Sequence, residues 1–229
     1  ENPKAKISVT GGGSGTGIAA LINKTTDIAM ASRDIKDSEK EDAKKNGVNV
    51  KEVIVGYDAI SIAINKKNGV SNLTIEQLRD IYLGKITNWK EVGGADKKII
   101  VLSRDSSSGT HVYFKEHILR KGNEKGPEEY SKEALFLPSN EALKSQVEKT
   151  KGAIAYIGMG YMENTVKEVT VNGVEATLAN VKAKKYPISR AVYWYVDKKA
   201  TGTTKDLINY MLSPKGQAIV KKEGFVPVK

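Results

Sequence analysis

The sequence of 229 residues contains no cysteine, and this absence excludes disulfide bonds, thiolate metal sites and cysteine nucleophiles. It contains only two histidines, His111 and His117, so we expect no zinc site, and we predict no metal and no cofactor. No apolar run approaches the ~20 residues that a helix needs to cross a bilayer. The first residues, Glu-Asn-Pro-Lys-Ala-Lys, also lack the apolar core of a signal peptide. We therefore expect that an export signal was either removed or never present.

Acidic residues are the scarcer charged group, since 37 lysines and arginines face 27 aspartates and glutamates and the net charge is +10. Only five of the cations are arginines, and the lysines are spread along the chain with glutamates between them. Proteins that bind nucleic acids usually concentrate their cations on one face. Scattered lysine is instead typical of a solvated surface. We therefore expect no nucleic-acid partner.

Short apolar segments alternate with amphipathic ones along the whole chain, and hydrophobic residues make up 39% of it, enough for a core. We predict strands at 6–10, 27–32, 50–55, 59–64, 99–103, 153–157 and 191–196. We predict helices at 18–22, 38–46, 74–84, 110–119 and 140–149, two short helices around Ser213-Pro214, and a hairpin turn at Asn172-Gly173. This order predicts an α/β fold with mixed, mostly parallel sheets. No low-complexity linker is present, so a division into two domains requires strands that cross between them.

Two loops rich in glycine and hydroxyl residues carry the clearest chemical signal. Residues 11–17 read Gly-Gly-Gly-Ser-Gly-Thr-Gly, and residues 104–110 read Arg-Asp-Ser-Ser-Ser-Gly-Thr. Each loop follows a predicted strand and opens a predicted helix, where free N–H groups and the positive end of the helix dipole favour an anion. Arg104 adds a permanently charged donor that suits tetrahedral oxyanions. Either loop alone is also typical of a tight turn with a good N-cap, but the two together predict an anion site.

A nucleotide site has partial support from the same region. Gly15, Gly17 and Ala20 match a loose dinucleotide-binding pattern, and Asp34 follows at nearly the expected distance. The second hydroxyl-rich loop has no place in such a site, and the sequence contains no Walker-type phosphate loop. We therefore favour an anion site of another kind.

A hydrolytic site has a superficial basis in Asp105, Ser108 and His111. These residues lie within one short stretch of chain, where a single turn entering a helix rarely provides the geometry of a working triad. We therefore expect a binding protein rather than an enzyme.

Five segments match, in order, the motifs of one known family. They are the loop from Gly11 to Ile18, Ala31-Ser32-Arg33, residues 80–86 followed by Asn88-Trp89, residues 104–110, and residues 223–227. The chain therefore resembles the PstS family, the phosphate-binding proteins of bacterial ABC importers, from about Pro3 to its end. The resemblance implies a two-lobed type II periplasmic-binding-protein fold that closes on phosphate between its lobes, without covalent chemistry.

By the same resemblance, residues 1–62 and 189–229 form lobe 1, and residues 63–188 form lobe 2. The implied partners are inorganic phosphate and an ABC permease outside the cytoplasm, in the periplasm or at the cell surface. Any membrane attachment would be through a lipid anchor outside this chain. Two alternatives stay open at this point: a phosphate- or nucleotide-processing enzyme, and a stand-alone phosphate scavenger or sensor.

The resemblance also implies a set of phosphate ligands. They are Ser14 in the first loop and Arg104, Ser108, Gly109 and Thr110 in the second. Gly15 and Thr16 are further candidates in the first loop.

The family's carboxylate has two alternative positions. One falls in the segment matching Ser32–Arg33, where this chain has an arginine, and the other falls before strand 59–64, where it has Asp58. We assign the carboxylate to Asp58 and expect Ser32 to be a contact. Arg33 is then either a ligand or the structural partner of Asp58. A turn residue after Gly56 is the simpler interpretation of Asp58.

The chain departs from the family at its start. Family members begin with a strand, a serine-rich loop and a long helix ahead of the segment that matches Pro3, and this first strand–helix unit is missing here. We expect a fragment, a site completed by a separate chain, or a permuted or engineered derivative. A missing strand leaves backbone groups unpaired and apolar surface exposed, so we expect these residues alone to fold with difficulty.

Overall fold

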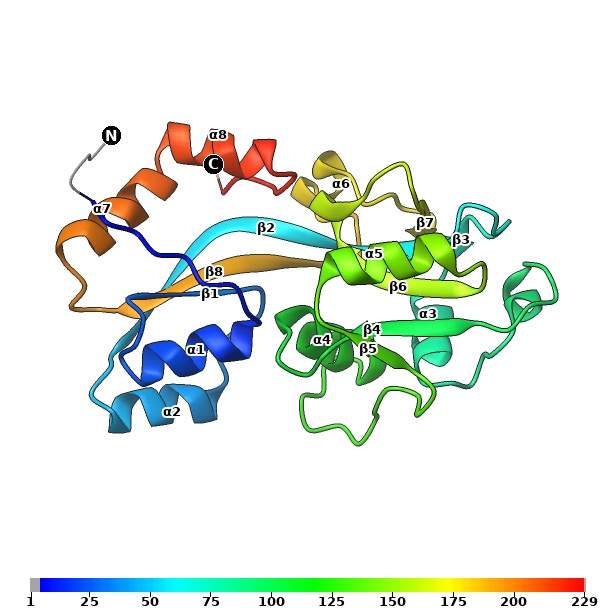
Figure 1. Cartoon of the computed structure of the whole chain (residues 1–229), viewed down its shortest axis with the longest axis horizontal. Helices are drawn as coiled ribbons and strands as arrows, with labels where there is room; N and C mark the ends of the chain where they lie inside the picture. The colour runs from blue at the N-terminus through cyan, green and yellow to red at the C-terminus, as the bar shows by residue number, and fades with distance from the viewer. Residues whose placement is uncertain (1–4, 229) are drawn as a thin grey trace.

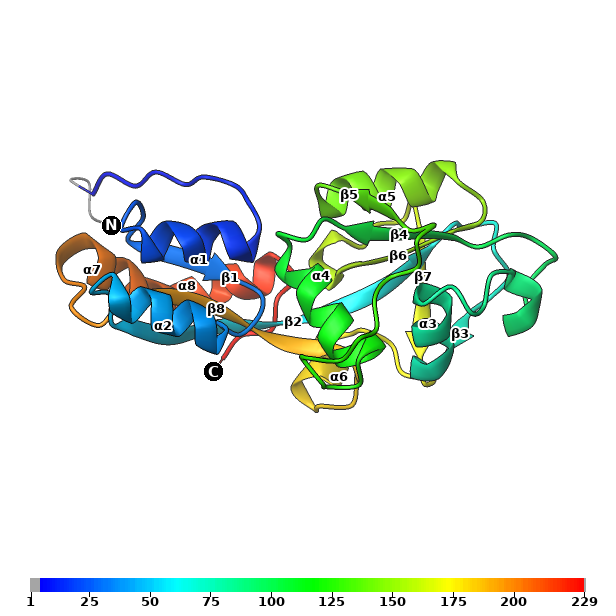
Figure 2. The ribbon, with the colours of Figure 1, turned by 90° about the horizontal axis from the view of Figure 1, so that it is seen from below.

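The computed structural model describes residues 5–228, which form two groups of helices and strands joined by a pair of long strands (Figure 1). The joining strands are β2 (Val50–Ile64) and β8 (Ser189–Asp197). The first group contains α1 (Ser14–Ile22), β1 (Ile28–Ala31), α2 (Asp37–Lys45), α7 (Gly202–Met211) and α8 (Pro214–Lys222). The second group contains β3 (Asn72–Leu73), α3 (Ile75–Tyr82), η1 (Trp89–Val92), β4 (Ile100–Arg104), α4 (Gly109–Phe114), η2 (Lys115–Leu119), β5 (Leu135–Leu137), α5 (Asn140–Lys149), β6 (Ala153–Gly158), η3 (Met159–Tyr161), β7 (Lys167–Val171) and α6 (Leu178–Lys182). In both views α4 lies on the side of the second group nearest to α1 (Figures 1 and 2).

The strands form a mixed sheet in the order β1-β8-β2-β6-β4-β5, with β7 pairing β2 and β3. The α/β class and the mixed sheet are confirmed. The expectation of mostly parallel pairing is wrong, because four of the seven strand pairings in the described residues are antiparallel. The reason is that β2 is the central strand, and β8, β6 and β7 all run against it.

Strand β2 is continuous where the sequence predicts two strands and a turn. Its register against β8 shifts between Ile54 and Gly56, which marks a bulge in the strand. Tyr57 N–H donates to Val226 O at 2.8 Å and Val226 N–H donates to Tyr57 O at 2.8 Å, so the chain near its end holds this stretch extended. Asp58 therefore lies inside a strand and not in a turn.

The partner of β2 changes within the strand. β2 pairs with β8 up to Ala59 and with β6 from Ile60 onward. The division into residues 1–62 with 189–229 and residues 63–188 stays a prediction, and this change of partner lies close to its first boundary. Residues 1–4 and 229 of that division lie outside the described residues.

The predicted strand at 6–10 is wrong, because these residues form no regular element. Ile7 and Val9 are 56% and 74% exposed. A strand needs a neighbour to pair its N–H and C=O groups, and the part of the chain that the structure describes offers this segment none. Alternating hydrophobicity alone does not supply that neighbour.

Other local signals are confirmed. The helix predicted from residue 74 is α3, which Thr74 and Gln77 open with a capping box, and the chain bends at Ser213-Pro214 between α7 and α8. Asn172 and Gly173 have positive φ values of 52° and 75°, as a tight hairpin turn requires, and Val171 pairs with Val174 across them. Among residues 5–228, none of the helices is both long and apolar enough to pass through a lipid bilayer.

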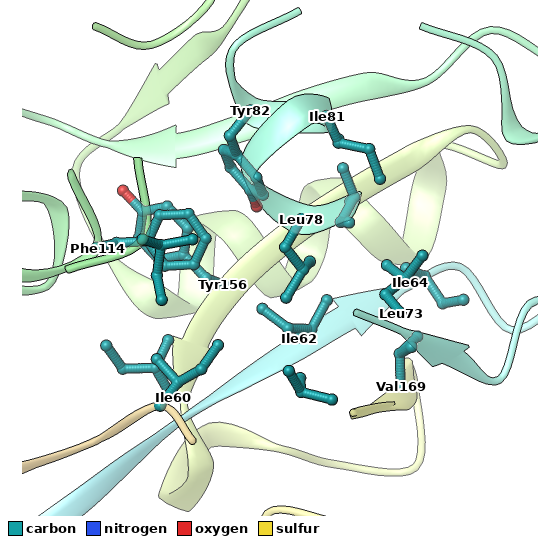
Figure 3. Close-up of a cluster of buried hydrophobic side chains, with 14 of the residues drawn as sticks. Ile60, Ile62, Ile64, Leu73, Leu78, Ile81, Tyr82, Phe114, Tyr156 and Val169 are labelled. Atoms are coloured by element: carbon teal, nitrogen blue, oxygen red, sulfur yellow. The ribbon is translucent and has the colours of Figure 1, made fainter. Parts of the chain in front are cut away.

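The largest apolar core lies in the second group, between β2 and the helices α3 and α4 (Figure 3). Ile60, Ile62 and Ile64 of β2 are fully buried there. The ring of Phe114 stacks on Tyr156 with centroids 4.3 Å apart. Full burial of an aliphatic side chain of this size contributes roughly 1.5–3 kcal/mol, so this core holds the far end of β2 and the end of α4 in place.

A buried polar network joins this core to the end of β4. Tyr156 Oη lies 2.6 Å from Ser103 Oγ and 3.0 Å from Tyr130 Oη. His111 Nδ1 lies 2.8 Å from the carbonyl oxygen of Arg104, which only accepts, so Nδ1 carries the proton. Burial lowers the pKa of His111 to about 4. The ring is therefore neutral at neutral pH and fastens the start of α4 to the end of β4.

We expect His111 to make folding stability depend on pH between about 6.5 and about 4. The folded-state pKa of about 4 lies below the ordinary value of 6.5, so the folded protein binds fewer protons in this window and its stability falls as the pH falls. The midpoint of thermal unfolding should decrease less steeply over this range in His111→Gln than in the parent. The exposed His117→Gln is the control and should keep the parent slope. Equal slopes in the parent and in His111→Gln would contradict the assignment.

Candidate anion-binding site

The first glycine loop becomes helical earlier than the sequence predicts, because α1 begins at Ser14 and not at Ile18. Ser14 is buried, and its Oγ accepts a hydrogen bond from the backbone N–H of Ser32 at 3.0 Å. The two hydroxyl oxygens lie 3.5 Å apart. Ser32 directly follows β1, so the start of α1 and the end of β1 present two hydroxyl groups side by side.

The second loop ends in an N-cap. Ser108 Oγ accepts hydrogen bonds from Thr110 N–H at 3.2 Å and His111 N–H at 3.4 Å, which caps α4. Ser108 and Thr110 are both buried. His111 Nδ1 contacts the carbonyl of Arg104, so the described residues contain no hydrogen bond between Ser108 and the ring of His111 that a triad would need.

The two loops, far apart in the sequence, meet in space. Gly15 N–H donates to Ser107 O at 3.2 Å. A Cβ atom at Gly109 would overlap Ser14 Oγ and lie 2.8 Å from Ser32 Oγ, and one at Gly13 would overlap Ser107 O. Only glycine at positions 13 and 109 allows the two loops to approach this closely. The approach places the hydroxyl groups of Ser14 and Ser32 against the start of α4.

Asp58 lies on β2 directly opposite Arg190 on β8, and the two form a buried ion pair. Their exposures are only 3% and 8%, and Arg190 Nη2 lies 3.1 Å from Asp58 Oδ2. The same Nη2 donates to Thr110 Oγ1 at 2.7 Å, so Arg190 links the carboxylate to the second loop. Among the described residues, Asp58 Oδ1 and the Nε and Nη1 atoms of Arg190 have no hydrogen-bond partner.

Two opposing effects act on the Asp58 carboxyl group. Burial raises the pKa of Asp58 above its ordinary value, while the charge and the hydrogen bond of Arg190, together with the backbone N–H groups of Met159 and Ala59, act to lower it. The sequence analysis missed Arg190. Its one local signal is an arginine just before a strongly apolar strand, and only the register between β2 and β8 identifies the residue that it faces.

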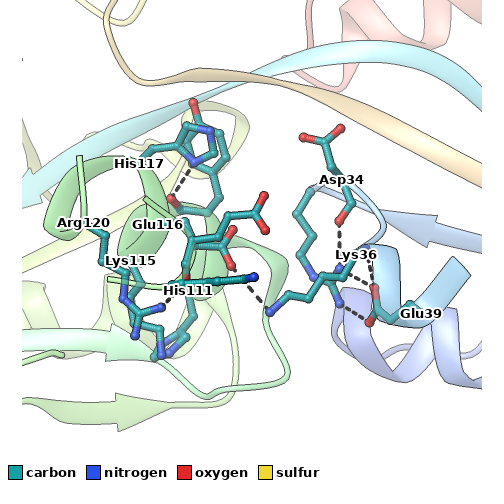
Figure 4. Close-up of polar contacts among 12 residues, drawn as sticks. Asp34, Lys36, Glu39, His111, Lys115, Glu116, His117 and Arg120 are labelled. Carbon is teal, nitrogen blue, oxygen red and sulfur yellow. Dashed lines mark hydrogen bonds and ion pairs between the residues drawn. The ribbon is translucent and has the colours of Figure 1, made fainter. Parts of the chain in front are cut away.

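Arg33 is held by Glu39 and not by Asp58, so the expectation that it is the structural partner of Asp58 is wrong. Its two terminal nitrogens lie 2.8 Å and 2.7 Å from the two carboxylate oxygens of Glu39, which lies in the first turn of α2 (Figure 4). Nearby, Lys36 Nζ lies 3.5 Å from Glu116 Oε1 and links the first group to η2. This corner therefore contains one ion pair within the first group and one that links the two groups.

Arg104 and Thr16 are the remaining predicted residues. Arg104 is the last residue of β4, and its Nη2 lies 3.8 Å from Asp105 Oδ2. Its Nε is buried and has no hydrogen-bond partner in the described residues, and no hydrogen bond or ion pair joins its guanidinium to Asp58. Thr16 is exposed. The structure therefore brings together Ser14, Ser32, Gly15 and Gly109, and separately Asp58 and Thr110 through Arg190.

Comparison with known proteins shows the family of this chain. Residues 1–215 match the model of the PBP superfamily domain. The phosphate-binding protein PstS of Borreliella burgdorferi is 33% identical over 238 residues, and that of Bacillus subtilis is 34% identical over 233 residues. Each alignment covers all of this chain, and it covers 82% and 73% of the respective relative.

A solved structure from Clostridium perfringens gives the same result. It is described as a phosphate ABC transporter substrate-binding protein with bound phosphate, and it superimposes on this chain with a TM-score of 0.90 at 39% identity. The alignment covers all of this chain and 90% of that one. The motifs, the sheet topology and these full-length matches lead to one conclusion: the chain belongs to the PstS family of phosphate-binding proteins within the PBP superfamily.

Proposed function

We propose that this protein binds inorganic phosphate between its two groups of elements and delivers it to the permease of an ABC importer. The PstS relatives are named for phosphate binding, and the Clostridium perfringens structure contains phosphate. The family binds solutes and does not transform them, so the protein is not an enzyme. A phosphate- or nucleotide-processing activity is not favoured.

One observation carries the proposal: a buried carboxylate oxygen and buried guanidinium nitrogens without partners lie in the ion pair that contacts Thr110 of the second loop. The oxygen is Asp58 Oδ1, and the nitrogens belong to Arg190. Buried polar groups are normally hydrogen-bonded, so these atoms match a ligand that both accepts and donates. Phosphate does both near neutral pH, because it carries negative oxygens together with at least one O–H.

The other contacts follow from the geometry of the loops. Ser14, Ser32 and Thr110 would offer hydroxyl groups to the anion, and the backbone N–H of Gly109 lies beside them. Arg104 would add a second cation through its unpartnered Nε. Ser108 supports the loop as the cap of α4 and is a ligand only if its hydroxyl also reaches the anion. Arg33, Gly15 and Thr16 lie at the edge of this set: Arg33 is held by Glu39, Gly15 by Ser107, and Thr16 is exposed.

The place of action follows from the family. PstS proteins act outside the cytoplasm, where they pass phosphate to a membrane permease. We propose the same for this chain, with attachment to the membrane, where it occurs, through a lipid anchor outside these residues.

Calorimetric titration of the protein with phosphate, sulfate and molybdate tests the proposal. We expect saturable binding of phosphate at one site per chain and much weaker binding of the other two anions. Phosphoesters incubated with the protein should release no product. Absence of phosphate binding by the folded protein, or turnover of a phosphoester, would overturn the proposal.

Gly109→Ala should weaken phosphate binding by about tenfold or more, since a methyl group there would overlap Ser14 Oγ and push the two loops apart. Alanine is a better helix former than glycine by roughly 0.5–1 kcal/mol, so α4 itself should not be lost. The matched control is Gly69→Ala, because a Cβ at Gly69 meets no atom within 4 Å. Titration of both variants, with unfolding midpoints, separates the effects. Parent-like affinity in Gly109→Ala would show that the loops need not approach.

Asp58→Asn should improve the binding of sulfate relative to phosphate. Fully ionised sulfate offers no proton to a carboxylate, whereas phosphate does, so we expect the parent to prefer phosphate by about 10³-fold. Asparagine supplies an N–H donor and removes the repulsion. Competition titrations on Asp58→Asn and on the exposed control Asp206→Asn measure the change. If Asp58→Asn discriminates as the parent does, the selecting carboxylate lies elsewhere.

A further inference from the structure

Arg190 occupies a central place that no motif in the sequence indicates. It faces Asp58 across β2 and β8 at the point where β2 is about to leave β8 and join β6. Its Nη2 is shared between Asp58 Oδ2 at 3.1 Å and Thr110 Oγ1 at 2.7 Å. One guanidinium nitrogen therefore contacts both the carboxylate and the second loop.

Tyr113, near the end of α4, keeps this guanidinium in one orientation. The Cζ atom of Arg190 lies 5.6 Å from the centre of the Tyr113 ring, within the range of a cation–π contact. Tyr113 Oη donates a hydrogen bond to the carbonyl oxygen of Ser189 at 2.8 Å, which anchors the residue before Arg190. Because Tyr113 contacts both the guanidinium of Arg190 and the backbone carbonyl before it, Arg190 has little freedom to leave Asp58.

Arg190 is also the charged side chain that compensates Asp58. Within residues 5–228, no other lysine or arginine forms an ion pair or hydrogen bond with this carboxylate. The phenols of Tyr113 and Tyr186 are its titratable neighbours, and burial raises the pKa of both, so they stay neutral near neutral pH. Backbone N–H groups of Met159 and Ala59 also act to lower the pKa of Asp58, but among the described residues Arg190 is the one cationic side chain that does so.

We propose that Arg190 is a specificity-determining residue: by holding Asp58 as a carboxylate, it keeps Oδ1 a hydrogen-bond acceptor that selects oxyanions carrying a proton. This inference rests on the proposed phosphate site. It assigns to Arg190 a role distinct from that of a cation that simply attracts anions, since attraction alone does not discriminate phosphate from sulfate.

Loss of the guanidinium should change the chemistry of Asp58. A buried carboxylate without its partner takes up a proton from solvent and becomes an O–H donor. A hydrogen-bond donor at this position binds sulfate as readily as phosphate. If Arg190 instead only attracted the anion or only stiffened the loop, its removal would weaken both anions alike and leave their ratio unchanged.

Titrations of phosphate and sulfate test this with a set of matched variants. In Arg190→Met, phosphate should bind more weakly and the phosphate-to-sulfate ratio should fall at least tenfold, toward that of Asp58→Asn. In Arg190→Lys, which keeps the charge, the ratio should stay within about threefold of the parent. Adding Arg190→Met to Asp58→Asn should leave the ratio unchanged. Arg79→Met removes a partly buried arginine that pairs with Glu128 outside the site, and it should keep the parent ratio. An equal loss of both anions in Arg190→Met would overturn the proposal.

A second measurement does not depend on phosphate binding. Carbon-13 NMR of labelled aspartate carboxyl groups, with the Asp58 signal identified by its loss in Asp58→Asn, follows the protonation of this group directly. The titration midpoint of Asp58 should rise by at least about one pH unit in Arg190→Met and change little in Arg79→Met. An unchanged midpoint in Arg190→Met would overturn the role of Arg190 even if the protein binds phosphate. A risen midpoint in a protein that binds no phosphate would instead leave the charge coupling intact and reject the proposed function.

Discussion

The pairing of Asp58 with Arg190 is the contact on which the arrangement of the site depends. A buried charge is costly without a partner, so the two side chains keep β2 and β8 in one register where β2 changes partners. The bond from Arg190 to Thr110 extends this constraint to α4. One ion pair therefore orders the strands that join the two groups and the second of the two glycine–hydroxyl loops.

The close approach of the two loops depends on glycine. Because Gly13 and Gly109 lack side chains, the first turn of α1 and the first turn of α4 approach until the hydroxyl of Ser14 lies against backbone. A larger residue at either position would hold the two groups apart. The site of this PstS-family protein thus combines charges held on strands with hydroxyl groups brought together by close backbone contact.

The apolar core and the polar groups buried beside it hold the second loop in place. Tyr156 stacks on Phe114 in the core and hydrogen-bonds Ser103 on β4, while His111 fastens α4 to the carbonyl of Arg104. Both ends of the second loop are therefore fixed by groups that are themselves buried. A loop anchored in this way needs little reorganisation on binding an anion, and lost conformational freedom is a main cost of binding.

Signals that act within a few residues were readable from the sequence alone. The helix start at residue 74, the Asn172-Gly173 turn, the glycine–hydroxyl loops and the family motifs all belong to this kind, and they determined the α/β class and most of the candidate ligands. Tertiary structure alone decided that 6–10 is not a strand, that β2 is continuous, that Glu39 holds Arg33 and that Arg190 faces Asp58. Each of these depends on which distant segment supplies the hydrogen-bonding or charged partner, because neighbouring residues set backbone conformation but do not determine the register between strands.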